Sequence, residues 1–159
     1  MTRLGVTGHQ AIPDVALDFV AEGITGQVSA VSPADLVVGV TSLAAGADQL
    51  FATIVIRCGG SLHVVVPASG YETTFNGKDR SEFSRLLQLA SEVERLPFDA
   101  PTEEAFFAAG KRVVDLCDVL LAVWDGEPSR GLGGTADVVR YACQAGRDVR
   151  IIWPAGVTR

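Results

Sequence analysis

The chain has 159 residues, of which 48% are hydrophobic and 20% are charged, and its formal net charge is -6 at pH 7. This size and composition suit one domain, residues 1–159, that buries roughly two-thirds of the surface its unfolded form would expose. Because a nucleic-acid surface needs clustered lysine and arginine, the acidic balance predicts no nucleic-acid partner, whereas a small anionic ligand held by backbone N–H groups is compatible with it.

The cysteines and the hydropathy pattern favour a cytoplasmic protein. Cys58, Cys117 and Cys143 are odd in number and lie far apart with no Cys-x-x-Cys pair, which favours reduced thiols in the core. No apolar run approaches the ~20 residues of a membrane span, and Met1–Leu4 leads into a strand without a signal-peptide segment. We therefore expect a cytoplasmic location and no membrane partner.

The chain begins with a predicted strand, turn and helix. Leu4–Val6 is predicted as a strand that ends in a phosphate-sized turn at Thr7–Gln10. A helix is expected from about Pro13 to Val28, because proline fits the first helical turn and apolar residues then recur at helical spacing.

The next strand and helix flank a segment of small residues. Leu36–Val40 is predicted as a buried strand, and the small residues of Thr41–Asp48 let the backbone come close to a ligand. The following helix, Ala47–Cys58, has polar side chains only in a narrow stripe, so its other faces should pack on the sheet and on a second subunit. We therefore expect a homodimer or a higher homo-oligomer.

The middle of the chain contains a third predicted strand, Leu62–Pro67, and a long segment, Ala68–Asp79. Asp79 with Glu82 three residues later predicts the start of a helix that continues to about Ser91.

The last third alternates predicted strands and helices. These elements are a short strand at Glu94–Leu96, a helix from Pro101 capped by Thr102, a strand at Val119–Trp124, a helix at Gly133–Gln144 and a strand at Val149–Trp153. A parallel connection needs a crossover helix, so this alternation predicts an α/β fold: a single-domain, Rossmann-like three-layer sandwich with a mostly parallel sheet.

In an open parallel sheet, a ligand lies beyond the carboxyl ends of the strands, where the winding direction reverses. Four predicted loops meet there: Thr7–Gln10, Ser42–Asp48, Pro67–Phe75 and Asp125–Asp137. The residues that we expect to bind a ligand are Thr7, Gly8, His9, Ser42, Gly46, Asp48, Pro67, Tyr71, Asp125, Arg130, Gly131, Gly133, Gly134 and Thr135.

The glycine-rich loop after Val119–Trp124 is the most informative of the four. Its glycines free the backbone to approach a phosphate, Thr135 offers a hydroxyl and Arg130 a cation. The helix that follows offers unpaired N–H groups to an anion. The alternative interpretation is a solvent-exposed turn with an ordinary helix cap.

Three aspartates fall at strand-to-helix junctions: Asp48, Asp125 and Asp137. Each could cap a helix, hydrogen-bond a ribose hydroxyl or help to cleave a glycosidic bond, so Asp137 and Asp48 are the candidate catalytic residues. Tyr71 and Phe75 could cover a base or form a local hydrophobic cluster.

Several common sites are not expected. The sequence lacks Gly-x-Gly-x-x-Gly, Gly-Lys-Ser/Thr and Gly-x-Ser-x-Gly motifs, which argues against a standard dehydrogenase, NTPase or α/β-hydrolase. His9 is interpreted as a polar ligand contact or loop cap and His63 as a buried core histidine. Neither histidine has a partner at metal-ligand spacing, so no metal site is expected.

Short stretches in four parts of the chain together carry a family resemblance. They are Thr7-Gly8-His9, Ser42-Leu43-Ala44-Ala45-Gly46-Ala47-Asp48, Tyr71 with Phe75, and Asp125-Gly126 with Gly133-Gly134-Thr135. Nearly the whole chain resembles the SLOG superfamily of Rossmann-like domains. That superfamily includes the LOG or "lysine decarboxylase-like" proteins, the DNA-processing protein A fold and proteins proposed to carry the molybdenum cofactor.

The resemblance implies a nucleotide or nucleotide-derived ligand at the glycine loop. LOG-type enzymes hydrolyse the N-glycosidic bond of nucleoside monophosphates with a Pro-Gly-Gly-x-Gly-Thr-x-x-Glu motif and an arginine elsewhere. In this chain the proline is missing, Leu132 interrupts the glycines, and Val138 stands where the motif has glutamate, one residue after Asp137. These departures argue against hydrolase activity and leave phosphate binding intact.

Three functions follow from the sequence. The first is a sensor or carrier that binds a phosphate-bearing small molecule such as a nucleotide. The alternatives are an N-glycosidic hydrolase of nucleoside monophosphates and a carrier of the molybdenum cofactor. No cofactor is certain from the residues alone.

Overall fold

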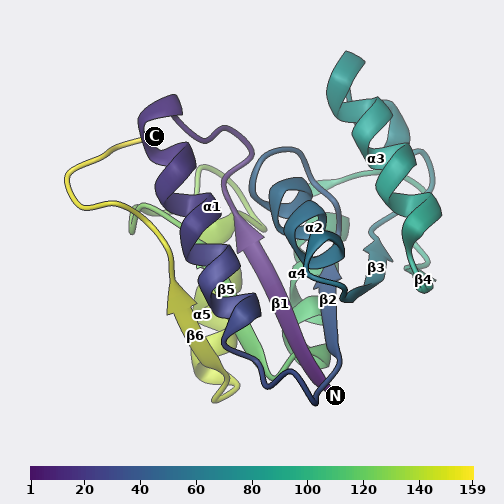
Figure 1. Ribbon diagram of the computed structural model, residues 1–159. Helices are drawn as coiled ribbons and strands as arrows, with labels where there is room; N and C mark the ends of the chain where they lie inside the picture. The colour runs from purple at the N-terminus through teal and green to yellow at the C-terminus, as the bar shows by residue number, and fades with distance from the viewer.

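The computed structural model describes residues 1–159, and Figure 1 shows a central sheet between two layers of helices. The strands are β1 (Thr2–Gly8), β2 (Val37–Thr41), β3 (Ser61–Val66), β4 (Glu92–Arg95), β5 (Val119–Val123) and β6 (Asp148–Ile151). The helices are α1 (Asp14–Ser29), α2 (Ala47–Arg57), α3 (Gly77–Leu89), α4 (Glu103–Leu116) and α5 (Thr135–Gln144), with a 3₁₀ helix, η1 (Tyr71–Thr74), before α3. None of the helices combines the length and apolarity that crossing a membrane requires.

All neighbouring strands of the sheet are parallel, in the order β4-β3-β2-β1-β5-β6. Leu4 of β1 lies opposite Gly39 of β2 on one side and Val119 of β5 on the other. The chain therefore winds outward from β1 in one direction as far as β4, and then returns to continue on the other side of β1. The predicted α/β sandwich with a parallel sheet is confirmed.

Helices cover both faces of the sheet, which is why the inner strands are almost wholly apolar. One face packs on α1, α2 and α3 through side chains that include Ile24, Phe51 and Leu86. The other face packs on α4 and α5 through side chains that include Val113 and Val138. Figure 1 shows α1 and α2 in front of the sheet and α4 and α5 behind it.

Several boundaries differ from the prediction for local physical reasons. Thr7 and Gly8, predicted as turn residues, extend β1 because they pair with the last two residues of β5. The last helix begins at Thr135 and not at Gly133, whose φ of +83° is incompatible with a right-handed helix. The α3 helix begins before Asp79, which lies in its first turn and is not its N-cap.

The apolar faces of α2 are covered by the protein's own helices. Phe51, Ala52 and Val55 are fully buried, and α2 packs between the sheet, α1 and α3. The apolar surface that led us to expect a second subunit therefore has its partner within the chain. A homo-oligomer remains a prediction, but α2 no longer supports it.

The three cysteines are all free thiols, but only Cys117 is buried. Cys58 at the end of α2 and Cys143 near the end of α5 are exposed. The prediction that all three lie in the core is therefore wrong for two of them.

Candidate functional site

A pocket of about 720 Å³ opens at the carboxyl ends of the strands. It is lined by the segments that follow β1, β2, β3 and β5, together with the start of α4. Because the winding direction reverses between β1 and β5, this is the position at which open α/β sheets bind ligands. The four loops that the sequence predicts to meet do line one pocket.

Most of the predicted binding residues line this pocket. They are Thr7, Gly8, His9, Ser42, Asp48, Pro67, Tyr71, Arg130, Gly131, Gly133, Gly134 and Thr135. Gly46, Asp125 and Asp137 do not line it. Residues that were not predicted to bind a ligand also line it, among them Asp79, Glu103, Ser129 and Arg159.

The glycine loop between β5 and α5 is folded against its own helix. The Gly133 backbone N–H donates to Oδ2 of Asp137 over 3.1 Å, and the Asp137 N–H donates to Oγ of Ser129 over 3.2 Å. A Cβ atom on Gly134 would lie 2.7 Å from the Ser129 side chain, so this close turn requires glycine or a local shift. Asp137 therefore stabilises the loop, and its carboxylate is occupied by the loop's own backbone.

The first turn of α5 has free hydrogen-bond donors. The backbone N–H groups of Thr135 and Ala136 have no hydrogen-bond partner in the protein. Unpaired N–H groups at a helix N-terminus carry a partial positive charge and bind anions. Arg130, which is exposed, adds a full positive charge at the same rim of the pocket.

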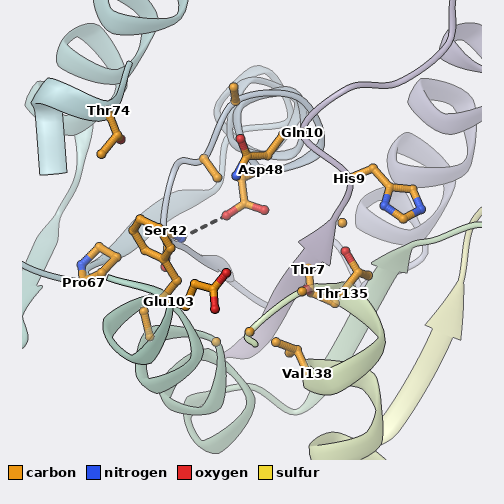
Figure 2. A pocket seen from close by; sticks show the side chains of 18 of the residues that line it. Thr7, His9, Gln10, Ser42, Asp48, Pro67, Thr74, Glu103, Thr135 and Val138 are labelled. Carbon is orange, nitrogen blue, oxygen red and sulfur yellow. Dashed lines mark hydrogen bonds between the residues drawn. The ribbon is translucent and has the colours of Figure 1, made fainter. Parts of the chain in front are cut away.

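Asp48 is a buried carboxylic acid in the pocket. It lies in the first turn of α2 and is only 7% exposed. Its Oδ2 accepts hydrogen bonds from the Thr41 hydroxyl at 3.1 Å and from the Ser42 backbone N–H at 3.2 Å. Burial raises the pKa of Asp48 to about 6 despite these bonds. Figure 2 shows its side chain among Gln10, Ser42 and Thr7 at the pocket.

Glu103 brings a second acid to the pocket, from the first turn of α4. Thr102 caps this helix as predicted, because its side chain accepts a hydrogen bond from the Ala105 N–H at 3.2 Å. The Glu103 carboxylate lies beside the glycine loop, since a Cβ atom on Gly131 would come within 2.7 Å of its Oε1 atom. The sequence did not place Glu103 at the site, because no local pattern reveals that these segments meet.

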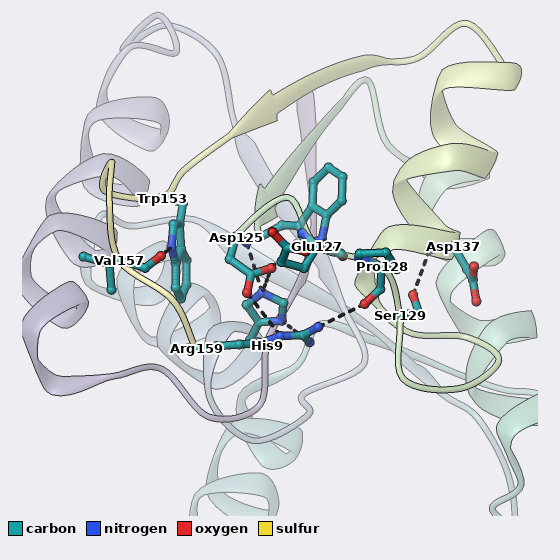
Figure 3. Close-up of polar contacts among 10 residues, drawn as sticks. His9, Asp125, Glu127, Pro128, Ser129, Asp137, Trp153, Val157 and Arg159 are labelled. Atoms are coloured by element: carbon teal, nitrogen blue, oxygen red, sulfur yellow. Dashed lines mark hydrogen bonds and ion pairs between the residues drawn. The ribbon is translucent and has the colours of Figure 1, made fainter.

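His9 lies in a buried polar cluster beside the pocket (Figure 3). Its Nε2 atom is 3.1 Å from Oδ1 of Asp125, and its Nδ1 atom is 3.2 Å from Nη1 of Arg159. Burial lowers the pKa of His9, with Asp125 opposing that effect and Arg159 adding to it. The Asp125 backbone N–H also points at Nε2, at 3.1 Å. A neutral ring with hydrogen on Nε2 donates to the Asp125 carboxylate and accepts from Arg159, but it cannot then accept from that backbone N–H.

Asp125 is the shared partner in this cluster. Burial alone would raise its pKa, but the Glu127 backbone N–H, His9 and Arg159 together hold that pKa below its usual value. The carboxylate is thus ionised, and its side chain is only 2% exposed. Asp125 therefore joins the β1 and β5 loops and does not face the ligand space.

The aromatic residues after β3 form a local hydrophobic cluster. The ring of Tyr71 meets Phe75 and Phe83 edge-on, with centroids 5.0 and 5.4 Å apart, and its hydroxyl donates to the Ser42 carbonyl oxygen at 3.0 Å. The hydrophobic cluster is present, and Tyr71 and Phe75 also line the pocket, so their contact with a base stays a prediction. His63 lies buried in β3, with its Nε2 atom 3.3 Å from Oε2 of Glu94.

Comparison with protein-family models gives no match, and comparison with curated proteins gives none either. Solved structures do share the fold. DNA processing protein A from Streptococcus pneumoniae superposes with a TM-score of 0.67 at 20% identity, over 94% of this chain and 50% of that one. The molybdenum cofactor carrier protein from Chlamydomonas reinhardtii gives a TM-score of 0.54 at 15% identity, over 94% and 75%.

DNA processing protein A from Helicobacter pylori is a third similar structure, with a TM-score of 0.66 at 14% identity over 94% of this chain and 64% of that one. This chain thus spans about half the length of the pneumococcal protein and under two-thirds of the one from Helicobacter pylori. The predicted Rossmann-like fold is confirmed by these neighbours.

The same neighbours correct one expectation from composition. We expected no nucleic-acid partner, but the Helicobacter pylori protein with this fold binds single-stranded DNA. The expectation rested on net charge and on the lack of lysine and arginine clusters. Backbone N–H groups and helix N-termini also contact nucleic-acid phosphates, so an acidic chain of this fold is not excluded from such binding.

Proposed function

We propose that the pocket binds a nucleotide or a nucleotide-derived small molecule, with its phosphate at the start of α5, as a sensor or carrier. One observation carries this proposal. Thr135, whose backbone N–H has no partner, and Asp48, a buried acid, line the same pocket from opposite sides of the reversal point. One end of the pocket therefore attracts an anion and the other accepts hydrogen bonds.

The charges around the pocket support a ligand with two chemically different ends. Two arginines, Arg130 and Arg159, lie with one acid, Glu103, on the side of the glycine loop. The opposite side has two acids, Asp48 and Asp79, from the segments around α2 and α3. A ribose phosphate has this polarity, because its phosphate is anionic and its hydroxyls donate hydrogen bonds to carboxylates. The volume of about 720 Å³ lies within the usual range for small-molecule sites.

A second candidate function is hydrolysis of an N-glycosidic bond, and Asp48 is the observation that favours it. An acid whose pKa is about 6 can donate or accept a proton near neutral pH. Asp137, the other candidate from the sequence, is bound to the Gly133 N–H and is not at the pocket surface. Asp48 is therefore the carboxylate to test.

Binding is tested by calorimetry with AMP, adenosine and inorganic phosphate. We expect AMP to bind at least tenfold more tightly than adenosine, which corresponds to about 1.4 kcal/mol for the phosphate. Equal affinity for AMP and adenosine, or no binding of any phosphate compound, would contradict the proposal. A single-stranded oligonucleotide and molybdopterin as further ligands distinguish the functions of the fold neighbours from nucleotide binding.

The variant pair Gly134→Asp and Gly134→Asn tests the position of the phosphate. Both side chains meet Ser129 and both are good helix N-caps, but only aspartate places a negative charge over the Thr135 N–H. We expect Gly134→Asp to weaken AMP binding at least tenfold more than Gly134→Asn does. Release of adenine from AMP by the natural protein, lost in Asp48→Asn, would instead support the hydrolase.

A further inference from the structure

The segment that follows β6 runs at the carboxyl edge of the sheet and brings Trp153 and Arg159 beside His9 (Figure 3). Trp153 meets the His9 ring edge-on, with centroids 5.3 Å apart, and its Nε1–H donates to the Val157 carbonyl oxygen at 2.8 Å. This turn brings Arg159 to the side of the pocket, where its side chain is 21% exposed. We call residues 152–159 the strap.

Arg159 makes three contacts with three different nitrogen atoms. Its Nε lies 3.2 Å from Oδ2 of Asp125, its Nη1 lies 3.2 Å from Nδ1 of His9, and its Nη2 donates to the Pro128 carbonyl oxygen at 3.0 Å. His9 follows β1, whereas Asp125 and Pro128 follow β5. The guanidinium therefore connects the two loops on either side of the reversal point.

The glycine loop makes few other hydrogen bonds or ion pairs outside its own helix. Beyond α5 and the adjacent Trp124, residues 125–134 reach other parts of the chain by hydrogen bonds and ion pairs only through His9 and Arg159. The remaining bonds of this loop are made within the loop, with α5, or with the adjacent Trp124, whose Nε1–H donates to the Glu127 carbonyl oxygen. The loop packs against Glu103 and Phe107 of α4, and its long-range polar contacts come from one buried histidine and one arginine of the strap.

We propose that Arg159 is a positioning residue, which holds the glycine loop so that the N-terminus of α5 is ready to receive the phosphate of the ligand. This inference rests on the proposed function. A preformed loop binds more tightly than a mobile one, because the ligand does not have to order it. Lysine cannot replace Arg159, since it has one nitrogen atom where the three contacts use three.

The pKa of His9 reports on its contact with Arg159. The charged groups that act on His9 are Asp125, Arg159 and Arg130, and burial acts with the two arginines to favour the neutral ring. Removing Arg159 removes a positive charge next to Nδ1. The pKa of His9, followed by NMR of its ring protons, is therefore expected to rise in Arg159→Ala.

The experiment compares Arg159→Ala and Arg159→Lys with Arg150→Ala, using AMP as the probe. Arg150 is a matched control from β6, since it also makes contacts through its guanidinium, to Gln27 and Asp148, but lies away from the pocket. We expect both Arg159 variants to bind AMP at least tenfold more weakly and Arg150→Ala to bind it normally. Guanidinium ion at non-denaturing concentration is expected to restore part of the affinity of Arg159→Ala.

Hydrogen exchange separates this inference from the proposed function. Backbone amides of residues 125–134 should exchange at least tenfold faster in both Arg159 variants than in Arg150→Ala, whether or not AMP binds. If the natural protein binds AMP and the Arg159 variants bind it equally well, the positioning role is overturned while the proposed function stands. If no phosphate compound binds, the proposed function fails. If, in addition, amide exchange of residues 125–134 and the pKa of His9 are unchanged in the Arg159 variants, the role of Arg159 is overturned as well.

Discussion

The Thr41 hydroxyl donates to Oδ2 of Asp48 over 3.1 Å and so joins the end of β2 to the first turn of α2 beneath the pocket. The same oxygen accepts the Ser42 N–H at 3.2 Å. Two donors on one oxygen hold a buried acid in a fixed position. They do not offset its burial fully, because its pKa still rises from 3.8 to about 6.

This raised pKa makes folding stability depend on pH. Between about pH 4 and 6 the folded protein binds a proton at Asp48 that the unfolded chain has lost, so this residue's contribution to stability falls as pH rises through that window. Asp48→Asn should abolish the fall and be more stable than the natural protein at pH 8, by up to about 3 kcal/mol. Urea unfolding at several pH values measures this.

Asp18→Asn is the control for this prediction, because Asp18 is an exposed acid on α1. It should keep the pH dependence of the natural protein. A pH profile of Asp48→Asn that parallels the natural one would mean that Asp48 titrates normally.

The Tyr71 hydroxyl should stabilise the β2–α2 loop. It donates to the Ser42 carbonyl oxygen at 3.0 Å, while the ring packs in the aromatic cluster. Tyr71→Phe keeps the ring and leaves that carbonyl without its donor, so we expect a loss of about 1 kcal/mol in the free energy of unfolding. Tyr141→Phe is a suitable comparison, since the Tyr141 hydroxyl donates to Asp115 at an exposed position. Its loss should lower the free energy of unfolding by less than the loss of the Tyr71 hydroxyl does. Equal losses would argue against a role for the buried bond.

Replacing each of two glycines of α1 with alanine should change the free energy of unfolding in opposite directions. A Cβ atom on Gly23 would lie 2.6 Å from Cγ2 of Ile152, whereas one on Gly26 meets nothing within 4 Å. Gly26→Ala should raise the free energy of unfolding by about 0.5–1 kcal/mol, because alanine favours the helix. Gly23→Ala should lower it by about 1–3 kcal/mol through overpacking. Thermal unfolding of the two variants side by side checks the sign.

The three thiols should differ in reactivity. Cys58 and Cys143 are exposed, while burial raises the pKa of Cys117 to about 11. Ellman's reagent should therefore titrate two thiols quickly in the native protein and the third only after unfolding. Rapid labelling of all three thiols would show that the β1–α4 contact around Cys117 opens readily.

The sequence was sufficient for features that depend on local pattern. The apolar run Val119–Val123, the Thr102 cap and the small residues before Asp48 each have one physical interpretation, and together they place the loops at one edge of a parallel sheet. The roles of Glu103 and Arg159 could not be predicted, because their contacts with the glycine loop join segments that are far apart in sequence.

Asp137 illustrates a different limit of sequence reasoning. Its place just after Thr135 fits either a ligand contact or a cap, and only the direction of its side chain decides between them. That side chain turns back to the Gly133 N–H. The narrow polar stripe of Ala47–Cys58 similarly could not reveal that α1 and α3 cover the apolar faces of α2.

The central position of β1 has a consequence for synthesis of the protein. Leu4 to Gly8 pair with Val119 to Val123, so one edge of β1 remains open on the ribosome until three-quarters of the chain has been made. Because sheet closure joins segments of such high sequence separation, refolding should be slower than for helical proteins of similar length. The strap follows β6 in the chain, so the residues that pack on His9 are synthesised after both strands of this pair.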